Sequence, residues 1–81
     1  MEIAQAISNA LAKIGIKTKK AQAEAVGERE QHWGQFVLGR GNPTESKIGR
    51  WVEAAETGVD QKLSLSYSVE TGWLARWAQP C

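Results

Sequence analysis

Gly27 stands between two helical patterns with almost no linker, and this junction restricts the fold more than any other feature of the chain. Ala23 precedes it by four residues and Trp33 follows it by six. A small residue lets two helix backbones approach closely, and a glycine can adopt the positive φ that ends a helix sharply. The indole of Trp33 then fills the angle between the helices. The pattern therefore predicts a helix-turn-helix, in which two short helices cross at Gly27.

Apolar residues recur with the helical period of about 3.6 residues on both sides of this junction. We therefore expect helices over residues 2–14, 19–26, 29–38 and 44–56. Thr18 and Thr44 are candidate N-caps, because a hydroxyl can accept a hydrogen bond from a free amide at a helix start. On the third helix, the residues that should face the core are Trp33, Phe36 and Val37.

The C-terminal part of the chain allows two interpretations. Between residues 63 and 69, apolar residues alternate with serines, which is the pattern of a half-buried strand. Trp73 and Trp77 lie four residues apart, as they would on one face of a helix. We favour an extended segment followed by a short helix, and the alternative is a β-hairpin that turns at residues 70–72. In both cases Tyr67 and the two tryptophans should cap the core or form a dimer contact.

Eighty-one residues suffice for one domain with a modest core, which dimerisation would help to stabilise. We treat residues 1–81 as a single helix-turn-helix domain, with residues 59–81 as a C-terminal extension. No apolar stretch approaches the ~20 residues of a membrane span, and polar residues interrupt the first apolar run. We therefore expect neither membrane association nor a signal peptide. The one cysteine, Cys81, cannot form an internal disulfide, which fits a reducing cytosol.

Charge is distributed unevenly, although the whole chain carries only +1. Residues 13–50 contain eight basic and four acidic residues, a net charge of +4. The remaining residues contain two basic and five acidic residues, a net charge of −3. This asymmetry indicates a basic surface on the helix-turn-helix part, which suits a nucleic-acid partner. The alternative is that the charges only cover solvated helix faces.

The sequence offers little for catalysis. It contains one histidine, one cysteine and no paired metal ligands. The Gly39-Arg40-Gly41 segment follows a predicted helix rather than a strand, so it does not match a phosphate-binding loop. We expect no enzyme activity, no cofactor, no metal site and no small-molecule substrate.

An ordered set of residues resembles the lambda-repressor/Cro-like (Xre-type) helix-turn-helix family over roughly residues 3 to 56: Ala23, Gly27, Trp33, Phe36, Gly39 and the Asn42-Pro43 turn. The resemblance implies a mainly α bundle of four to five helices with a short extended C-terminal segment, or with a C-terminal β-hairpin. It also implies a phage or prophage regulator that binds a double-stranded DNA operator as a dimer in the bacterial cytosol. The alternative is a protein-interaction module of the same fold, such as an antitoxin or antirepressor.

The resemblance and the helix pattern together indicate which residues would contact DNA. Side chains that should face outward on the third helix and read bases are Arg29, Glu30, Gln31, His32 and Gln35. Candidates for phosphate contacts are Lys17, Thr18, Lys19, Lys20, Arg40 and Asn42. The alternative is that all of these are ordinary solvent-facing side chains. Glu28 and Glu30 depart from the expected pattern, because their carboxylates would put negative charge near the groove. Gly34, unusual inside a helix, indicates close packing.

Overall fold

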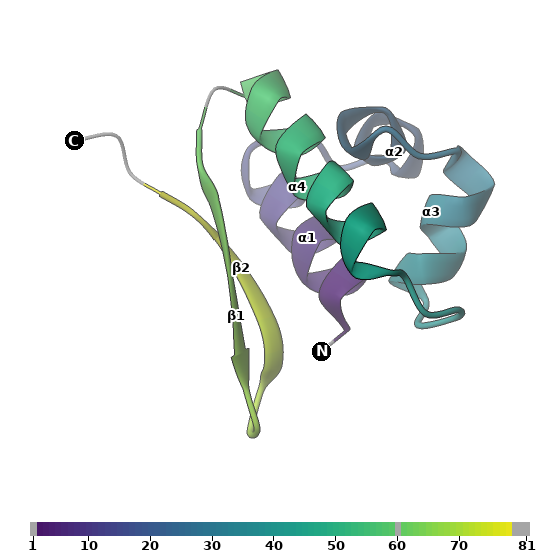
Figure 1. The fold of residues 1–81 in the computed structure, drawn as a ribbon. Helices are drawn as coiled ribbons and strands as arrows, with labels where there is room; N and C mark the ends of the chain where they lie inside the picture. The colour runs from purple at the N-terminus through teal and green to yellow at the C-terminus, as the bar shows by residue number, and fades with distance from the viewer. Residues whose placement is uncertain (1, 60, 79–81) are drawn as a thin grey trace.

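A computed structural model describes residues 2–59 and 61–78, which form four helices followed by a two-stranded hairpin (Figure 1). The elements in chain order are α1 (Ile3–Lys13), α2 (Lys19–Val26), α3 (Glu30–Val37), α4 (Glu45–Val59), β1 (Leu63–Ser68) and β2 (Gly72–Trp77). In Figure 1, α1 and α4 lie between the hairpin on one side and α2 and α3 on the other. The hairpin and α3 therefore lie on opposite sides of the molecule.

The junction between α2 and α3 is as tight as the sequence predicts. Gly27 has a φ of 75°, in the left-handed region. Its N–H donates to the carbonyl of Glu24 at 3.3 Å, and the N–H of Glu28 donates to the carbonyl of Ala23 at 2.9 Å. This pair of bonds is the Schellman motif, which needs a residue that tolerates positive φ. Equivalent bonds end α1 and α3 at Gly15 and Gly39.

Both predicted N-caps are confirmed. The hydroxyl oxygen of Thr18 accepts a hydrogen bond from the Ala21 N–H at 3.1 Å. That of Thr44 accepts one from the Lys47 N–H at 3.2 Å. These side chains satisfy amides that have no partner within the helix, which fixes where α2 and α4 begin. Helix α4 continues to Val59 rather than ending at residue 56.

The core is built around three aromatic residues of α3 and α4. Trp33 and Trp51 are 0% and 1% exposed, and their rings meet edge to face with centroids 5.1 Å apart. The ring of Phe36 also meets that of Trp51 edge to face, with centroids 5.2 Å apart. Ile7 and Leu11 of α1 are fully buried in the same cluster. The inward-facing side of α3 predicted from its helical period is thus confirmed: Trp33 is buried in the core, and Phe36 and Val37 pack against it.

The C-terminal segment is a β-hairpin, so the short helix that we favoured for residues 73–77 is wrong and the alternative is confirmed. Strands β1 and β2 pair antiparallel, with Leu63 opposite Trp77 and Tyr67 opposite Trp73. The spacing of four residues misled because it brings two side chains to one face of a helix and equally to one face of a strand. A helix and a strand can be distinguished here only by whether a partner strand is present. Residues 72–77 have one, because they pair with β1 across the turn that ends at Gly72.

One face of the hairpin packs on α1. Leu63 and Ala75 form a second buried cluster with Ala6 and Ala10. The indole N–H of Trp77 donates to the Ala10 carbonyl at 2.8 Å. A two-stranded hairpin is marginally stable by itself in water, so α1 supplies the surface on which this one becomes stable.

Within the described residues, no helix has the length and apolar character needed to cross a membrane.

Candidate nucleic-acid interface

A single buried amide connects α3 to the two helices before it. The Trp33 indole N–H donates to Oε1 of Gln22 at 3.1 Å, and the Ser8 hydroxyl donates to the same oxygen at 2.6 Å. Nε2 of Gln22 donates to the carbonyls of Ile16 at 3.0 Å and Ser8 at 3.3 Å. Only 5% of Gln22 is exposed. This amide therefore fixes the indole that seats α3 against α1 and α2.

The sequence analysis did not identify Gln22 as important, although a signal was present. Gln22 lies four residues before Val26 and next to Ala23, on the stripe of α2 that the helical period turns inward. A polar residue on an inward stripe requires buried hydrogen-bond partners. Trp33 carries an N–H that needs an acceptor when buried, so the two could have been paired from their chemistry.

With Trp33 held inside, the opposite side of α3 faces solvent. All five residues proposed to read bases are exposed: Arg29, Glu30, Gln31, His32 and Gln35. At about 100° per residue, Gln31 and Gln35 lie together on the side of α3 opposite Trp33, whereas Glu30 and His32 project to its two flanks. Arg29 is the N-cap residue. The structure thus leaves all five side chains accessible and brings Gln31 and Gln35 onto one face.

The proposed phosphate contacts are also exposed: Lys17, Thr18, Lys19, Lys20, Arg40 and Asn42. The structure places Lys19 directly against α3, because a Cβ built on Gly34 would lie 3.1 Å from its Cδ, Cε and Nζ atoms. This contact agrees with the close packing predicted at Gly34. Lys17 and Lys19 line a pocket of about 240 Å³ beside Trp33 and Gly34. Arg40 lies beyond the other end of α3.

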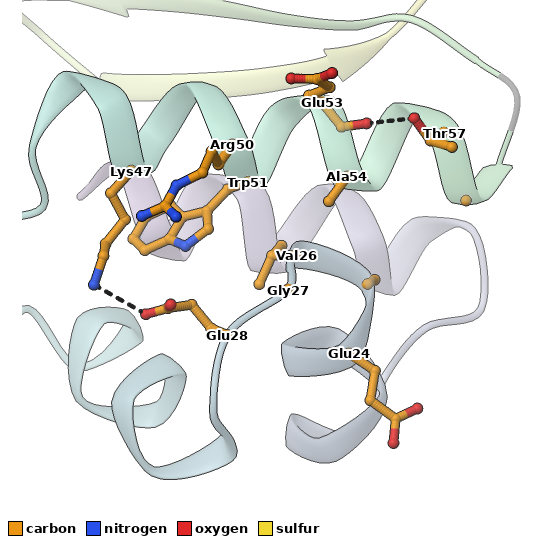
Figure 2. Close-up of a pocket in the computed structure, with 12 residues that line it drawn as sticks. Glu24, Val26, Gly27, Glu28, Lys47, Arg50, Trp51, Glu53, Ala54 and Thr57 are labelled. Carbon is orange, nitrogen blue, oxygen red and sulfur yellow. Dashed lines mark hydrogen bonds and ion pairs between the residues drawn. The ribbon is translucent and has the colours of Figure 1, made fainter.

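Glu28 does not face the proposed DNA surface, so that part of the sequence analysis is wrong. Its carboxylate lies 3.4 Å from Nζ of Lys47 at the start of α4, and its side chain is only 14% exposed (Figure 2). The same ammonium group lies 5.2 Å from the ring centroid of Phe36. Glu28 therefore ties the turn before α3 to α4. Glu30, in contrast, is exposed at the start of α3, as the sequence analysis expected.

The three aromatic residues proposed for dimerisation have different surroundings. Trp77 is half-buried and bonded to α1, so it caps the core within one chain. Trp73 is half-buried, and its ring meets that of Tyr67 with centroids 5.4 Å apart. Tyr67 is 64% exposed, and Val69 near the hairpin turn is 94% exposed. The residues of the hairpin that are free to form a dimer contact are thus Tyr67 and Val69 rather than Trp77.

These observations define a small four-helix domain with a tight α2–α3 junction, an exposed α3 and a C-terminal hairpin. No family model, curated protein or solved structure matches this chain. Membership of the lambda-repressor/Cro-like family therefore stays a prediction from the residues that carry the resemblance.

Proposed function

We propose that this protein is a sequence-specific DNA-binding transcriptional regulator that acts as a dimer on a double-stranded operator. The observation that supports this function best is α3, which buries Trp33 on one side and exposes Gln31 and Gln35 on the other. A short helix that packs against the protein core on one side and is exposed on the other can enter the major groove. Its exposed side chains can then contact base edges.

The exposed residues of α3 have suitable chemistry for this role. The Gln31 side chain has a donor and an acceptor in one plane, which matches adenine. The Arg29 guanidinium has two parallel donors, which matches guanine. Glu30 can only accept, so it would favour the amino group of cytosine. Each good bidentate contact discriminates against a wrong base by about 1–3 kcal/mol.

Lysines beside α3 would bind the phosphate backbone. Lys19 extends across Gly34, so its ammonium lies next to the helix that would occupy the groove. Lys17 lines the same pocket. Such contacts fix the register of a protein on DNA, and they make affinity fall as salt concentration rises.

If two copies pair through their hairpins, both α3 helices stay exposed, because the hairpin lies across the molecule from α3 (Figure 1). The same position puts the two α3 helices at the far ends of such a dimer. A dimer that binds two half-sites presents its recognition helices on one side, about 34 Å apart, so the two copies must also be inclined toward the DNA. Tyr67 is the exposed aromatic side chain from which such a contact could be built.

The decisive experiment selects bound duplexes from a random pool and then compares variants on the selected operator and on a scrambled duplex. We expect Gln31→Ala to reduce operator affinity about tenfold, in line with the loss of one bidentate base contact, and to leave scrambled-duplex affinity unchanged. Gln61→Ala is a matched control, because this exposed glutamine lies outside α2 and α3. Equal loss on both duplexes would remove Gln31 from base reading, and failure of the wild type to bind any duplex would refute the function.

Phosphate binding has a separate signature. Lys19→Ala should weaken binding to both duplexes similarly and reduce the slope of log affinity against log salt by about 1. Lys62→Ala provides the control, because Lys62 lies beyond α4 next to the hairpin. An unchanged slope for Lys19→Ala would exclude Lys19 from the phosphate contacts.

A second candidate function is a protein-interaction module, such as an antitoxin or antirepressor. The observation that favours it is the exposed apolar surface of the hairpin at Tyr67 and Val69, together with Glu30 on α3. Such a module would not retain duplex DNA even at low salt, whereas the DNA-binding regulator would bind most tightly there.

A further inference from the structure

The indole N–H of Trp51 is the one buried side-chain nitrogen or oxygen among the described residues without a hydrogen-bond partner. Trp51 is 1% exposed. The indoles of Trp33 and Trp77, by contrast, donate to Gln22 and to the Ala10 carbonyl. Buried donors are almost always satisfied, so an unpaired one requires an explanation.

Trp51 lines a pocket of about 570 Å³ between α2 and α4 (Figure 2). Figure 2 shows the nitrogen on the edge of the indole that faces Gly27 and Glu28, at the turn before α3. Val26 and Ala54 contribute apolar walls from the two helices. The unpaired donor therefore lies just beneath the wall of the pocket, on the side of Gly27 and Glu28.

Three acidic and two basic residues line this pocket: Glu24, Glu28, Glu53, Lys47 and Arg50. Lys47 is paired with Glu28, while Arg50 forms no ion pair with any residue in the described part of the chain. The carboxylates of Glu24 and Glu53 point away from the pocket in Figure 2. One guanidinium is thus left to attract an anion, whereas a dianion would meet Glu28 without a second free cation.

We propose that this pocket binds a small monocarboxylate with an apolar body. One carboxylate oxygen accepts the Trp51 N–H, the Arg50 guanidinium pairs with the carboxylate, and the apolar body packs against Val26 and Ala54. The indole nitrogen is buried, so the exposed side chain of Arg50 shifts as the ligand enters, while Lys47 keeps its ion pair with Glu28. Binding itself does not depend on the proposed function.

Occupancy would act on α3. The ligand would contact the turn at Gly27 and Glu28, which leads into α3. It would also contact Trp51, whose ring packs against Trp33 and Phe36 of α3. A change of DNA affinity on ligand binding is therefore expected, and this consequence alone rests on the proposed function.

The test follows the indole N–H signals of ¹⁵N-labelled full-length protein during titration with 4-methylpentanoate or benzoate up to about 10 mM, a range that detects millimolar affinity. We expect the Trp51 signal to shift downfield and to saturate, because its proton gains an acceptor. The signals of Trp33 and Trp77, whose protons are already bonded, should move less. The neutral analogue 4-methylpentanol should produce no saturable shift.

Arg50→Gln should raise the dissociation constant of either carboxylate at least about tenfold. Arg76→Gln is the matched control, because Arg76 is exposed on β2. Absence of a saturable shift with both carboxylates, equal binding of the alcohol, or unchanged affinity in Arg50→Gln would each overturn the site. Failure of the protein to bind DNA would refute the proposed function while leaving the carboxylate titration interpretable.

Discussion

At the scale of single residues, Gln22 connects several segments of the fold through one buried amide. Its amide accepts hydrogen bonds from Ser8 and Trp33 and donates to the carbonyls of Ile16 and Ser8. These partners belong to α1, the loop after it and α3. One side chain thus forms hydrogen bonds to polar groups of three segments. Loss of a hydrogen bond to a buried polar group is costly, because the protein interior has a low dielectric constant.

We predict that Gln22→Leu lowers the free energy of unfolding by about 1–3 kcal/mol, because the Trp33 N–H loses its acceptor without access to water. Urea denaturation followed by tryptophan fluorescence measures this change. Gln5→Leu is the matched control on the exposed side of α1 and should alter stability by less than about 0.5 kcal/mol. Equal effects of the two substitutions would show that the Gln22 network does not stabilise the fold.

At the scale of elements, the four helices could be predicted from the sequence because the features that specify a helix are local. Caps such as Thr18, the glycine turn at Gly27 and apolar periodicity all act within one or two turns of chain. The exposed residues of α3 could then be predicted as those on the side away from its buried residues. The period-two alternation indicated strand β1, but whether residues 73–77 formed a helix or a second strand depended on pairing with β1. The Glu28–Lys47 ion pair joins residues nineteen positions apart, so no local signal specified it.

The same substitution should have opposite effects at two glycines. Gly27→Ala should destabilise the protein by about 1–2 kcal/mol, because φ is +75° and an L-residue is strained there. No atom lies within 4 Å of a Cβ built at either Gly27 or Gly49, so steric overlap is not involved.

Gly49→Ala, inside α4, should stabilise the protein by up to about 1 kcal/mol, because alanine is the better helix former. Chemical denaturation of both variants measures the change in the free energy of unfolding and therefore its sign at each position. Destabilisation at both positions would mean that α4 does not have the described helical geometry around Gly49.

At the scale of the whole molecule, α1 and α4 separate the hairpin from α3 (Figure 1). Trp77 binds the hairpin to α1 within one chain, while Tyr67 faces solvent. The residues that stabilise the hairpin are therefore different from those available for a second copy, and substitution can separate the two roles.

We predict that Tyr67→Ser lowers the average mass measured by light scattering and changes the melting temperature little, because Tyr67 is 64% exposed. Trp77→Phe should instead lower the free energy of unfolding by about 1 kcal/mol, because it removes the bond to the Ala10 carbonyl. A wild-type protein that stays monomeric at all concentrations would refute dimerisation. A Trp77→Phe variant as stable as the wild type would show that this bond adds no stability.

The bond between Trp77 and Ala10 closes a loop of 67 residues, and this has a consequence during synthesis. The helices leave the ribosome well before β2 does, so Ala6 and Ala10 stay uncovered until the chain beyond residue 77 has been made. During that interval the nascent chain exposes an apolar seam on α1. The hairpin of a neighbouring chain has the same sequence and would fit this seam equally well, so exchange of hairpins between copies is the expected misassembly at high expression.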